Sequence, residues 1–159
     1  MIEVYAAIQA KIKEAVPAAR TVERFFGQLA MAAAGDGNTV IFPAVYYELV
    51  NIRCSTRSKG IQDCEGTLRL RHCDQALVVS QLRTPDLEQS TYFELTGFRG
   101  DTIRTSLDRS AIYPDPTFRG VEVIISEYPI QWVDSTLINR QYISIEGSTL
   151  DRESSVSLQ

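Results

Sequence analysis

The stretch TVIFPAVYYELVNI, from Thr39 to Ile52, decides the fold together with TLRLRHC, from Thr67 to Cys73. The first stretch is rich in Val, Ile, Tyr and Phe, which favour strands, and Pro43 near its start suits a strand entrance or a sheet edge. The second alternates Leu with Arg, a period-two pattern typical of a strand with one wet face. The two stretches, joined by a polar and basic segment, are therefore predicted to form one long β-hairpin.

The pairing register of this hairpin follows from its side chains, because a slip of one residue would turn the apolar set to the other face. The register that sets Val50 opposite Leu68 also sets Cys54 opposite Cys64 near the hairpin tip. The chain has three cysteines and no close Cys-x-x-Cys pair. We therefore expect two thiols at the tip, with a disulfide as the alternative.

Helices are predicted on both sides of the hairpin. In Ile2–Val16 apolar residues recur at three- and four-residue steps, which predicts an amphipathic helix closed near Pro17. In Thr84–Thr96 the first residue is a suitable N-cap, Pro85 suits the first helical position, and acids occupy the first turn. Between helix and hairpin, the Ala-rich end of an apolar stretch leads into a loop at Gly35–Asn38.

The remainder of the chain adds strands. Val121–Tyr128 alternates clearly, Thr102–Leu107 is a short strand or extended segment, and Gln141–Glu146 is a last strand or arm. The order of elements predicts one α+β domain over residues 1–146, with a mainly antiparallel sheet, the long hairpin, and two helices packed on one side. Residues 147–159, rich in serine, are predicted to form a flexible C-terminal tail.

Composition narrows the class of protein. The chain has 159 residues, a formal charge of −4, 44% hydrophobic and 23% charged residues, which are values of a folded globular domain. The acidic balance argues against a general nucleic-acid binder. The longest apolar run, Leu29–Ala34, is far too short to span a membrane, and the N-terminus does not resemble a signal peptide. We therefore expect folding in a cytosol.

Arginine dominates the basic residues: of the 16 Lys and Arg, 13 are Arg. Arg suits protein interfaces because its planar guanidinium makes forked contacts and tolerates partial desolvation. The densest basic patch is predicted on the hairpin, at Arg53, Arg57 and Lys59 near the tip, with Arg69 and Arg71 along one strand. This patch is either a solvated tip or a surface that docks on an acidic protein or approaches nucleic acid. Protein is the favoured partner, because no aromatic residues that could stack on bases are interleaved with the patch.

A catalytic set is missing from the sequence. His72 and Cys73 are neighbours, but neighbours on a strand point to opposite faces and cannot act as a thiol and its base. With Cys64 and Asp74 they match no common metal-ligand spacing, and no phosphate-binding or hydrolase motif occurs. No catalytic, cofactor-binding or metal-binding residue is predicted. The remaining candidates for a cation site are acids in a loop-rich region: Asp101, Asp108 and Asp115.

Several short patterns together resemble the tail terminator and tail-completion proteins of long-tailed bacteriophages. These proteins have an N-terminal helix, a Phe-Pro strand, a basic hairpin and a second helix. The corresponding segments here are Phe42–Glu48, Gly66–Leu70, Leu95–Asp101, Leu107–Arg109 with Asp115, and Val121–Tyr128. The resemblance spans about residues 1 to 135 and rests on order and short patterns, with least support beyond Gln141.

The resemblance implies a structural protein of the virion and no enzyme. Such proteins form a ring, usually a hexamer, that caps the tail tube, ends its growth and offers a surface for the head connector. The implied partners are further copies of the chain, the tail-tube protein and the head-completion or connector protein, while DNA only passes through the channel. No cofactor and no membrane are implied, and assembly takes place in the host cytoplasm.

Three alternatives stay open. The chain is similar in size and expected architecture to other neck or head-tail joining proteins of phages. A small cytosolic adaptor would bind an acidic partner through the hairpin tip at Arg57 and Lys59. A small enzyme would use His72, Cys73 or the loop acids.

Overall fold

The fold was analysed in a computed structural model, which describes residues 2–34, 40–75, 84–118 and 120–135. Three helices and five strands follow one another along the chain. Their bounds are α1 Ile2–Ala15, β1 Thr21–Arg24, α2 Gln28–Ala34, β2 Ala44–Ser58, β3 Ile61–Gln75, α3 Thr84–Leu95, β4 Ala111–Pro114 and β5 Val121–Asp134.

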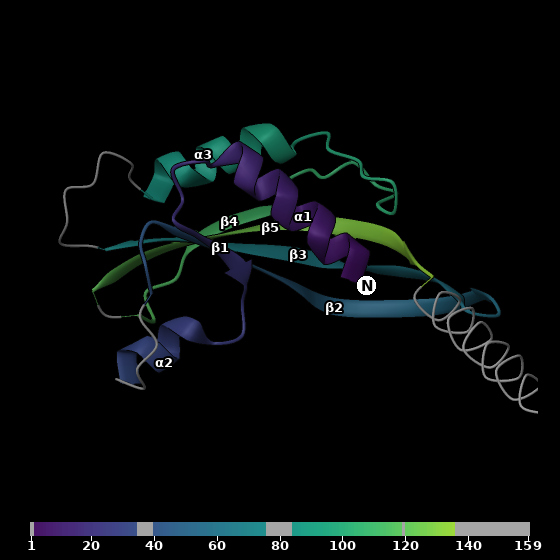
Figure 1. The fold of residues 1–159 in the computed structure, drawn as a ribbon, viewed down its shortest axis with the longest axis horizontal. Coiled ribbons are helices and arrows are strands. Elements are labelled where there is room, and N and C mark those ends of the chain that lie inside the picture. The colour runs from purple at the N-terminus through teal and green to yellow at the C-terminus, as the bar shows by residue number, and fades with distance from the viewer. Residues whose placement is uncertain (1, 35–39, 76–83, 119, 136–159) are drawn as a thin grey trace, which may run out of the picture.

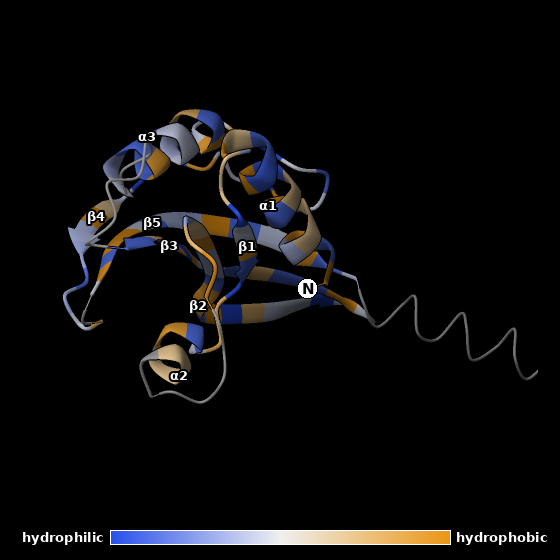
Figure 2. Ribbon diagram, turned by 60° about the vertical axis from the view of Figure 1, so that its left-hand side comes forward, coloured by the Kyte–Doolittle hydropathy of each residue, from blue (hydrophilic) through white to orange (hydrophobic). Residues whose placement is uncertain are grey.

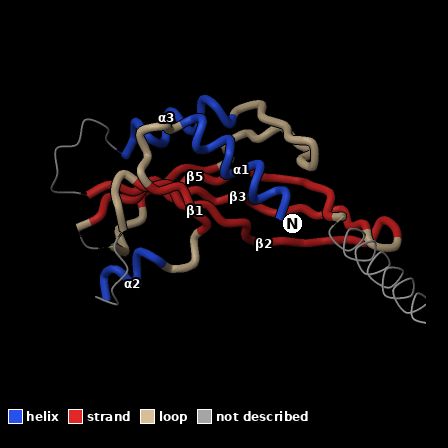
Figure 3. The backbone as a smooth tube through the Cα atoms, in the orientation of Figure 1, coloured by secondary structure: helices blue, strands red, loops and turns tan. Residues whose placement is uncertain are grey.

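The five strands form one sheet in the order β1-β2-β3-β5-β4. All neighbouring pairs are antiparallel except β1 and β2, which are parallel. The long strands β2, β3 and β5 run together to the hairpin turn (Figure 3). The short strands β1 and β4 flank the other end of the sheet (Figure 1). The predicted α+β fold with a mainly antiparallel sheet and a long hairpin is confirmed.

The two faces of the sheet carry separate cores. Helices α1 and α3 pack on one face, which we call the helix-covered face, where the main core includes Ile8, Leu68 and Trp132 (Figures 1 and 2). Helix α2 lies on the opposite face, where a smaller core includes Leu29 and Tyr46. The prediction of two helices on one side is thus correct for α1 and α3 but misses α2.

Helix α2 was missed because it lacks an apolar stripe of helical period. Its sequence QLAMAAA is mostly alanine, the residue with the highest helix propensity, and the turn before it contains Gly27 at a φ of 99°. The Gln28 side chain fixes this entrance, because its Oε1 accepts from the Phe26 N–H at 2.8 Å and its Nε2 donates to the Arg24 carbonyl at 2.6 Å.

The predicted hairpin register is correct near the tip and wrong by one residue nearer the base. Cys54 does pair with Cys64, but Val50 pairs with Thr67 rather than Leu68. The difference is a β-bulge at residues 51–52, where Asn51 adopts a φ of 55°, a left-handed conformation that Asn tolerates well. The extra residue shifts the alternation of β2 by one position. As a result Cys54 lies on the helix-covered face, as Leu49 does before the bulge.

Strand β5 extends to Asp134, beyond the predicted end at Tyr128. The strand accommodates Pro129 because the N–H groups at this alternating position, those of Gln131 and Val133, point away from β3 and donate to Thr105 Oγ1 and the Thr102 carbonyl. The missing N–H of a proline at this alternating position therefore breaks no bond to β3. The segment that accepts these bonds is Thr102–Leu107, which was predicted as a short strand or extended segment. It runs along the outer edge of β5.

The predicted strand or arm at Gln141–Glu146 and the predicted tail at residues 147–159 lie outside the described residues. Within the described part of the chain, no helix is long and apolar enough to span a membrane.

Candidate functional site

The structure separates the five predicted basic residues into two groups. Arg53, Arg57 and Lys59 lie on the exposed end of the hairpin. Arg69 and Arg71 lie in the middle of β3, between β2 and β5, and are largely covered. The two groups differ in what they can bind, because only the first is free of ion pairs within the described structure.

Arg69 and Arg71 are paired with carboxylates on both neighbouring strands. The Arg69 Nε donates to Glu127 Oε1 at 2.8 Å, and its Nη1 lies 3.5 Å from Glu48 Oε1. Arg71 donates to the same Glu48 oxygen, and its guanidinium lies 3.9 Å from the centroid of the Phe25 ring. The row ties β2, β3 and β5 together on the face opposite α1 and α3.

The electrostatics of Glu127 follow from this row. Partial burial raises the pKa of its carboxyl, but hydrogen bonds from Arg69 and Tyr113 outweigh burial and hold the pKa below its ordinary value. The Tyr113 hydroxyl donates to Glu127 Oε1 at 2.9 Å, which extends the row to β4. These charges are satisfied inside the sheet and leave little for a partner.

The residues at the hairpin tip differ from this row in both exposure and pairing. Within the described residues, Arg53, Arg57 and Lys59 form no ion pair, and all three are exposed. Arg53 faces Glu65 across the hairpin. The tip is therefore the part of the predicted patch that remains able to attract an acidic surface.

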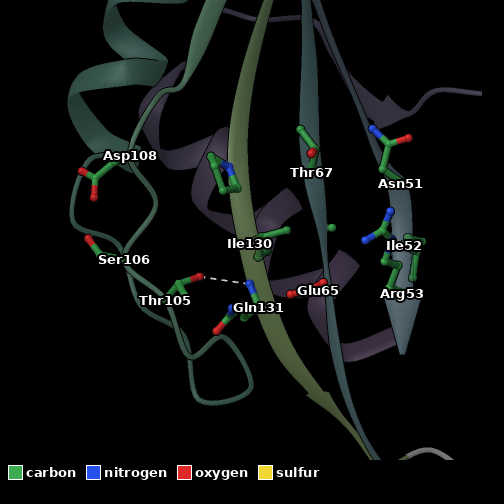
Figure 4. A pocket seen from close by; sticks show the side chains of 12 residues that line it. Asn51, Ile52, Arg53, Glu65, Thr67, Thr105, Ser106, Asp108, Ile130 and Gln131 are labelled. Atoms are coloured by element: carbon green, nitrogen blue, oxygen red, sulfur yellow. Dashed lines mark hydrogen bonds between the residues drawn. The ribbon is translucent and has the colours of Figure 1, made fainter. Parts of the chain in front are cut away.

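An open groove of about 610 Å³ lies beside the bulge (Figure 4). Its polar lining includes Arg53, Glu65, Gln131 and Asp108, and the hydrogen bond from the Gln131 N–H to Thr105 closes one side. Gly66 also lines it, and a Cβ there would lie 3.0 Å from the Val50 carbonyl oxygen. The lining also includes the apolar Ile52, Pro129 and Ile130, and among the described residues it contains no histidine or cysteine.

The residues considered for an enzymatic site are not brought together. His72 lies on the helix-covered face opposite Val45, whereas Cys73 packs in the smaller core on the other face. Burial lowers the pKa of the His72 imidazole to about 4 and raises the pKa of the Cys73 thiol to about 12. Both groups are fully buried, so neither contacts solvent.

The loop acids are also apart from one another. Asp108 lines the groove, Asp101 is exposed in the preceding loop, and Asp115 accepts bonds from the Thr117 N–H and hydroxyl. The described residues contain no group of three or more His, Cys, Asp or Glu placed to hold a metal ion.

Cys54 and Cys64 form a disulfide near the tip. The expectation of two thiols there was wrong. That expectation followed from the reducing cytosol in which the chain was expected to fold. The register instead places the two residues directly opposite each other, with their Cα atoms 4.1 Å apart. The free cysteine is Cys73, which is buried.

The sequence analysis missed two features of this region: the pairing of Arg69 and Arg71 with carboxylates, and the outer edge of β2 beyond Tyr47, where the pairing with β1 ends. Glu48 lies between the apolar Tyr47 and Leu49, a pattern that places its side chain on the other face of β2 from theirs. No local pattern pairs Glu48 or Glu127 with a particular arginine. The free edge has no sequence signal, because it depends on where β1 ends.

The described chain is thus a single-domain α+β protein. Its sheet has α1 and α3 on one face and α2 on the other, and its hairpin ends in an exposed basic tip. No model of a known protein family matches the sequence, and no curated protein matches it.

Proposed function

We propose that the protein is a structural subunit of a bacteriophage tail, a tail terminator. Copies assemble into a ring of six subunits, the number that the resemblance to tail terminators implies. The ring caps the tail tube, ends its growth and offers a surface to the head connector. The proposal is supported by the order of short sequence patterns, by the α+β fold and by the surface features described next.

The observation that carries the proposal is the position of exposed apolar side chains at two opposite ends of the sheet. Phe26 and Ile41, beside β1, are 66% and 52% exposed, and Ile112 on β4 is 49% exposed. Because β1 and β4 are the first and last strands of the sheet, one surface of a subunit would meet a different surface of the next. Such heterologous contacts generate closed rings when the rotation closes.

The hairpin tip supplies the second contact. Arg53, Arg57 and Lys59 give this end of the molecule a local positive charge, although the chain as a whole carries −4. An acidic surface on the tube protein or on the connector would be attracted to this end.

Electron microscopy of the purified protein, alone and mixed with isolated tail tubes, tests the proposal. Rings are expected in the free protein, and density at one end of each tube in the mixture. The paired variants Ile41→Lys and Ile112→Lys should abolish rings, because each puts a charge into one half of the apolar contact.

A matched control is Ile2→Lys, since Ile2 is 72% exposed but lies at the start of α1 and not at either sheet end. This variant should still form rings. A protein that stays monomeric at high concentration and does not bind tubes would contradict the proposal.

A second candidate function is an adaptor that binds an acidic protein through the hairpin tip. The observation in its favour is that Arg57 and Lys59 are exposed and unpaired within the described structure. Charge reversal at both positions should then abolish binding while the protein stays folded and monomeric.

A further inference from the structure

The sheet has two short outer strands, and side chains protect both. On β1, the outward carbonyl of Val22 accepts from Gln9 Nε2 at 2.9 Å, and that of Arg24 accepts from Gln28 Nε2 at 2.6 Å. On β4, Pro114 has no N–H to offer. Both devices are typical of edges that are protected from pairing with another chain.

The outer edge of β2 is different. Strand β1 pairs with β2 only from Ala44 to Tyr47, and the last bond on this side runs from the Phe25 N–H to the Tyr47 carbonyl at 2.8 Å. From residue 48 to residue 58, no described residue pairs with this edge. We call residues 49–58 the free β2 edge.

The other side of the same three-stranded region is covered. The Arg104 N–H donates to the Gln131 carbonyl at 2.8 Å, and the Val133 N–H donates to the Thr102 carbonyl at 3.0 Å. The outer edge of β5 is therefore occupied up to the tip. Of the long strand edges that the structure describes, the free β2 edge is the one left open.

The backbone groups of this edge are oriented for strand addition. Cys54 and Cys64 are directly opposite with Cα atoms 4.1 Å apart, the close spacing of a pair that exchanges no hydrogen bonds. The N–H and C=O of Cys54 consequently point away from β3, and the alternation of a strand places those of Thr56 in the same direction. An added strand would find donors and acceptors at both residues.

The charge of the edge limits what can pair with it. Between Leu49 and Lys59 the chain has three bases, Arg53, Arg57 and Lys59, and no acid. Two copies of this edge paired with each other would bring like charges together, which is unfavourable. The edge therefore fits an extended segment that carries negative charge.

The C-terminal part of the chain has this chemistry. The segment Gln141–Glu146 alternates as a strand does, and residues 141–159 contain three acids and one base, which gives −2. Strand β5 ends at Asp134, opposite Gln62 and close to the hairpin turn. Residues 135–140 can span about 20 Å when extended, so the segment that follows is not confined to the end of β5.

We propose that Gln141–Glu146 of one subunit adds as a strand to the free β2 edge of its neighbour. The inference rests on the proposed ring and names the joint between its subunits. Main-chain hydrogen bonds supply the affinity of such an added strand, and side-chain charge selects the partner. The disulfide-linked end of the hairpin provides the rigid side of the joint.

Two proline variants test the joint from its two sides. Thr56→Pro removes an outward N–H and leaves the bonds between β2 and β3, and Ile143→Pro removes strand pairing from the donated segment while β2 is unchanged. Thr56→Ala and Ser154→Pro are the matched controls. We expect monomers from the first two variants and rings from the controls and the unaltered protein.

Mixing the two proline variants distinguishes pairing between subunits from pairing within one chain. The Thr56→Pro chain still has a donor segment, and the Ile143→Pro chain still has an open edge, so an equimolar mixture should give 1:1 dimers. No dimer in the mixture would overturn pairing between subunits. In hydrogen exchange, the amides of Cys54 and Thr56 should exchange about tenfold more slowly in the unaltered ring than in the Ile143→Pro protein.

Failure of this inference differs from failure of the proposed function. If the unaltered protein and both proline variants form the same rings, the joint is overturned and the ring stands. If the unaltered protein forms no ring and binds no tail tube, the proposed function and the joint are both overturned.

Discussion

Lowering the pH from 7 to 4 should destabilise the protein through His72, the single histidine of the chain. The imidazole is fully buried, and its Nδ1 lies 3.3 Å from the Ile124 carbonyl oxygen, the position of a donated hydrogen bond. Its Nε2 has no partner within the described structure. A second proton on the ring would therefore create a buried charge whose Nε2–H has no acceptor.

The size of the effect follows from the two pKa values. Burial, reinforced by the nearby positive charge of Arg109 and opposed by the Ile124 carbonyl, lowers the pKa of His72 from 6.5 to about 4 in the folded protein. Between these pH values the unfolded chain binds the proton and the folded chain does not, so stability falls as the pH falls. The loss amounts to about 3 kcal/mol of the free energy of unfolding.

Urea denaturation at pH 7, 5.5 and 4 measures this loss, with His72→Asn as the comparison. The variant keeps a polar group near Nδ1 but does not titrate, and carboxylates such as Glu127 contribute equally to both proteins. The unaltered protein should lose about 3 kcal/mol more than the variant over this range. Parallel stability curves for the two proteins would refute the burial of a neutral His72.

Three further predictions concern the packing around the sheet. Arg109→Met should lower the free energy of unfolding, measured by urea denaturation, by about 3 kcal/mol. The reason is that Glu88, only 2% exposed, would lose its partner Arg109 Nη1, which lies 2.6 Å away. An unchanged urea midpoint would contradict this pairing. Gly66→Ala should lower the free energy of unfolding, measured by thermal unfolding, by about 1 kcal/mol or more, because the new Cβ would lie 3.0 Å from the Val50 carbonyl oxygen. Gly97→Ala is the comparison variant: its new Cβ would have open space around it, so it tests the effect of backbone conformation alone. Leu68→Ala should cost about 2–5 kcal/mol, since Leu68 is fully buried beneath the helices, and a loss below that of Ile2→Ala at the surface would be inconsistent with this core.

Local signals were sufficient for much of the fold. The apolar spacing of α1 predicts the helix and its buried residues Ile8 and Ile12, and α3 begins at Thr84, where its start was predicted. The hairpin followed from the period-two pattern of its strands. Each helix depends on residues close in the sequence, and the hairpin pairs two strands that follow one another directly along the chain.

Features set by distant pairing could not be predicted. The bulge at Asn51 shifts the register by one residue, and no local pattern announces it. Likewise, Arg69 looked like a free charge in the sequence, because its partner Glu127 is 58 residues away. The exposed basic tip was recognisable because Arg53, Arg57 and Lys59 cluster in one short polar segment of the sequence.

The mass of the purified protein in solution tests the proposed ring most directly. A hexameric ring predicts one closed species at six times the chain mass of 17.8 kDa. A monomer at every concentration, with no binding to tail tubes, would contradict it.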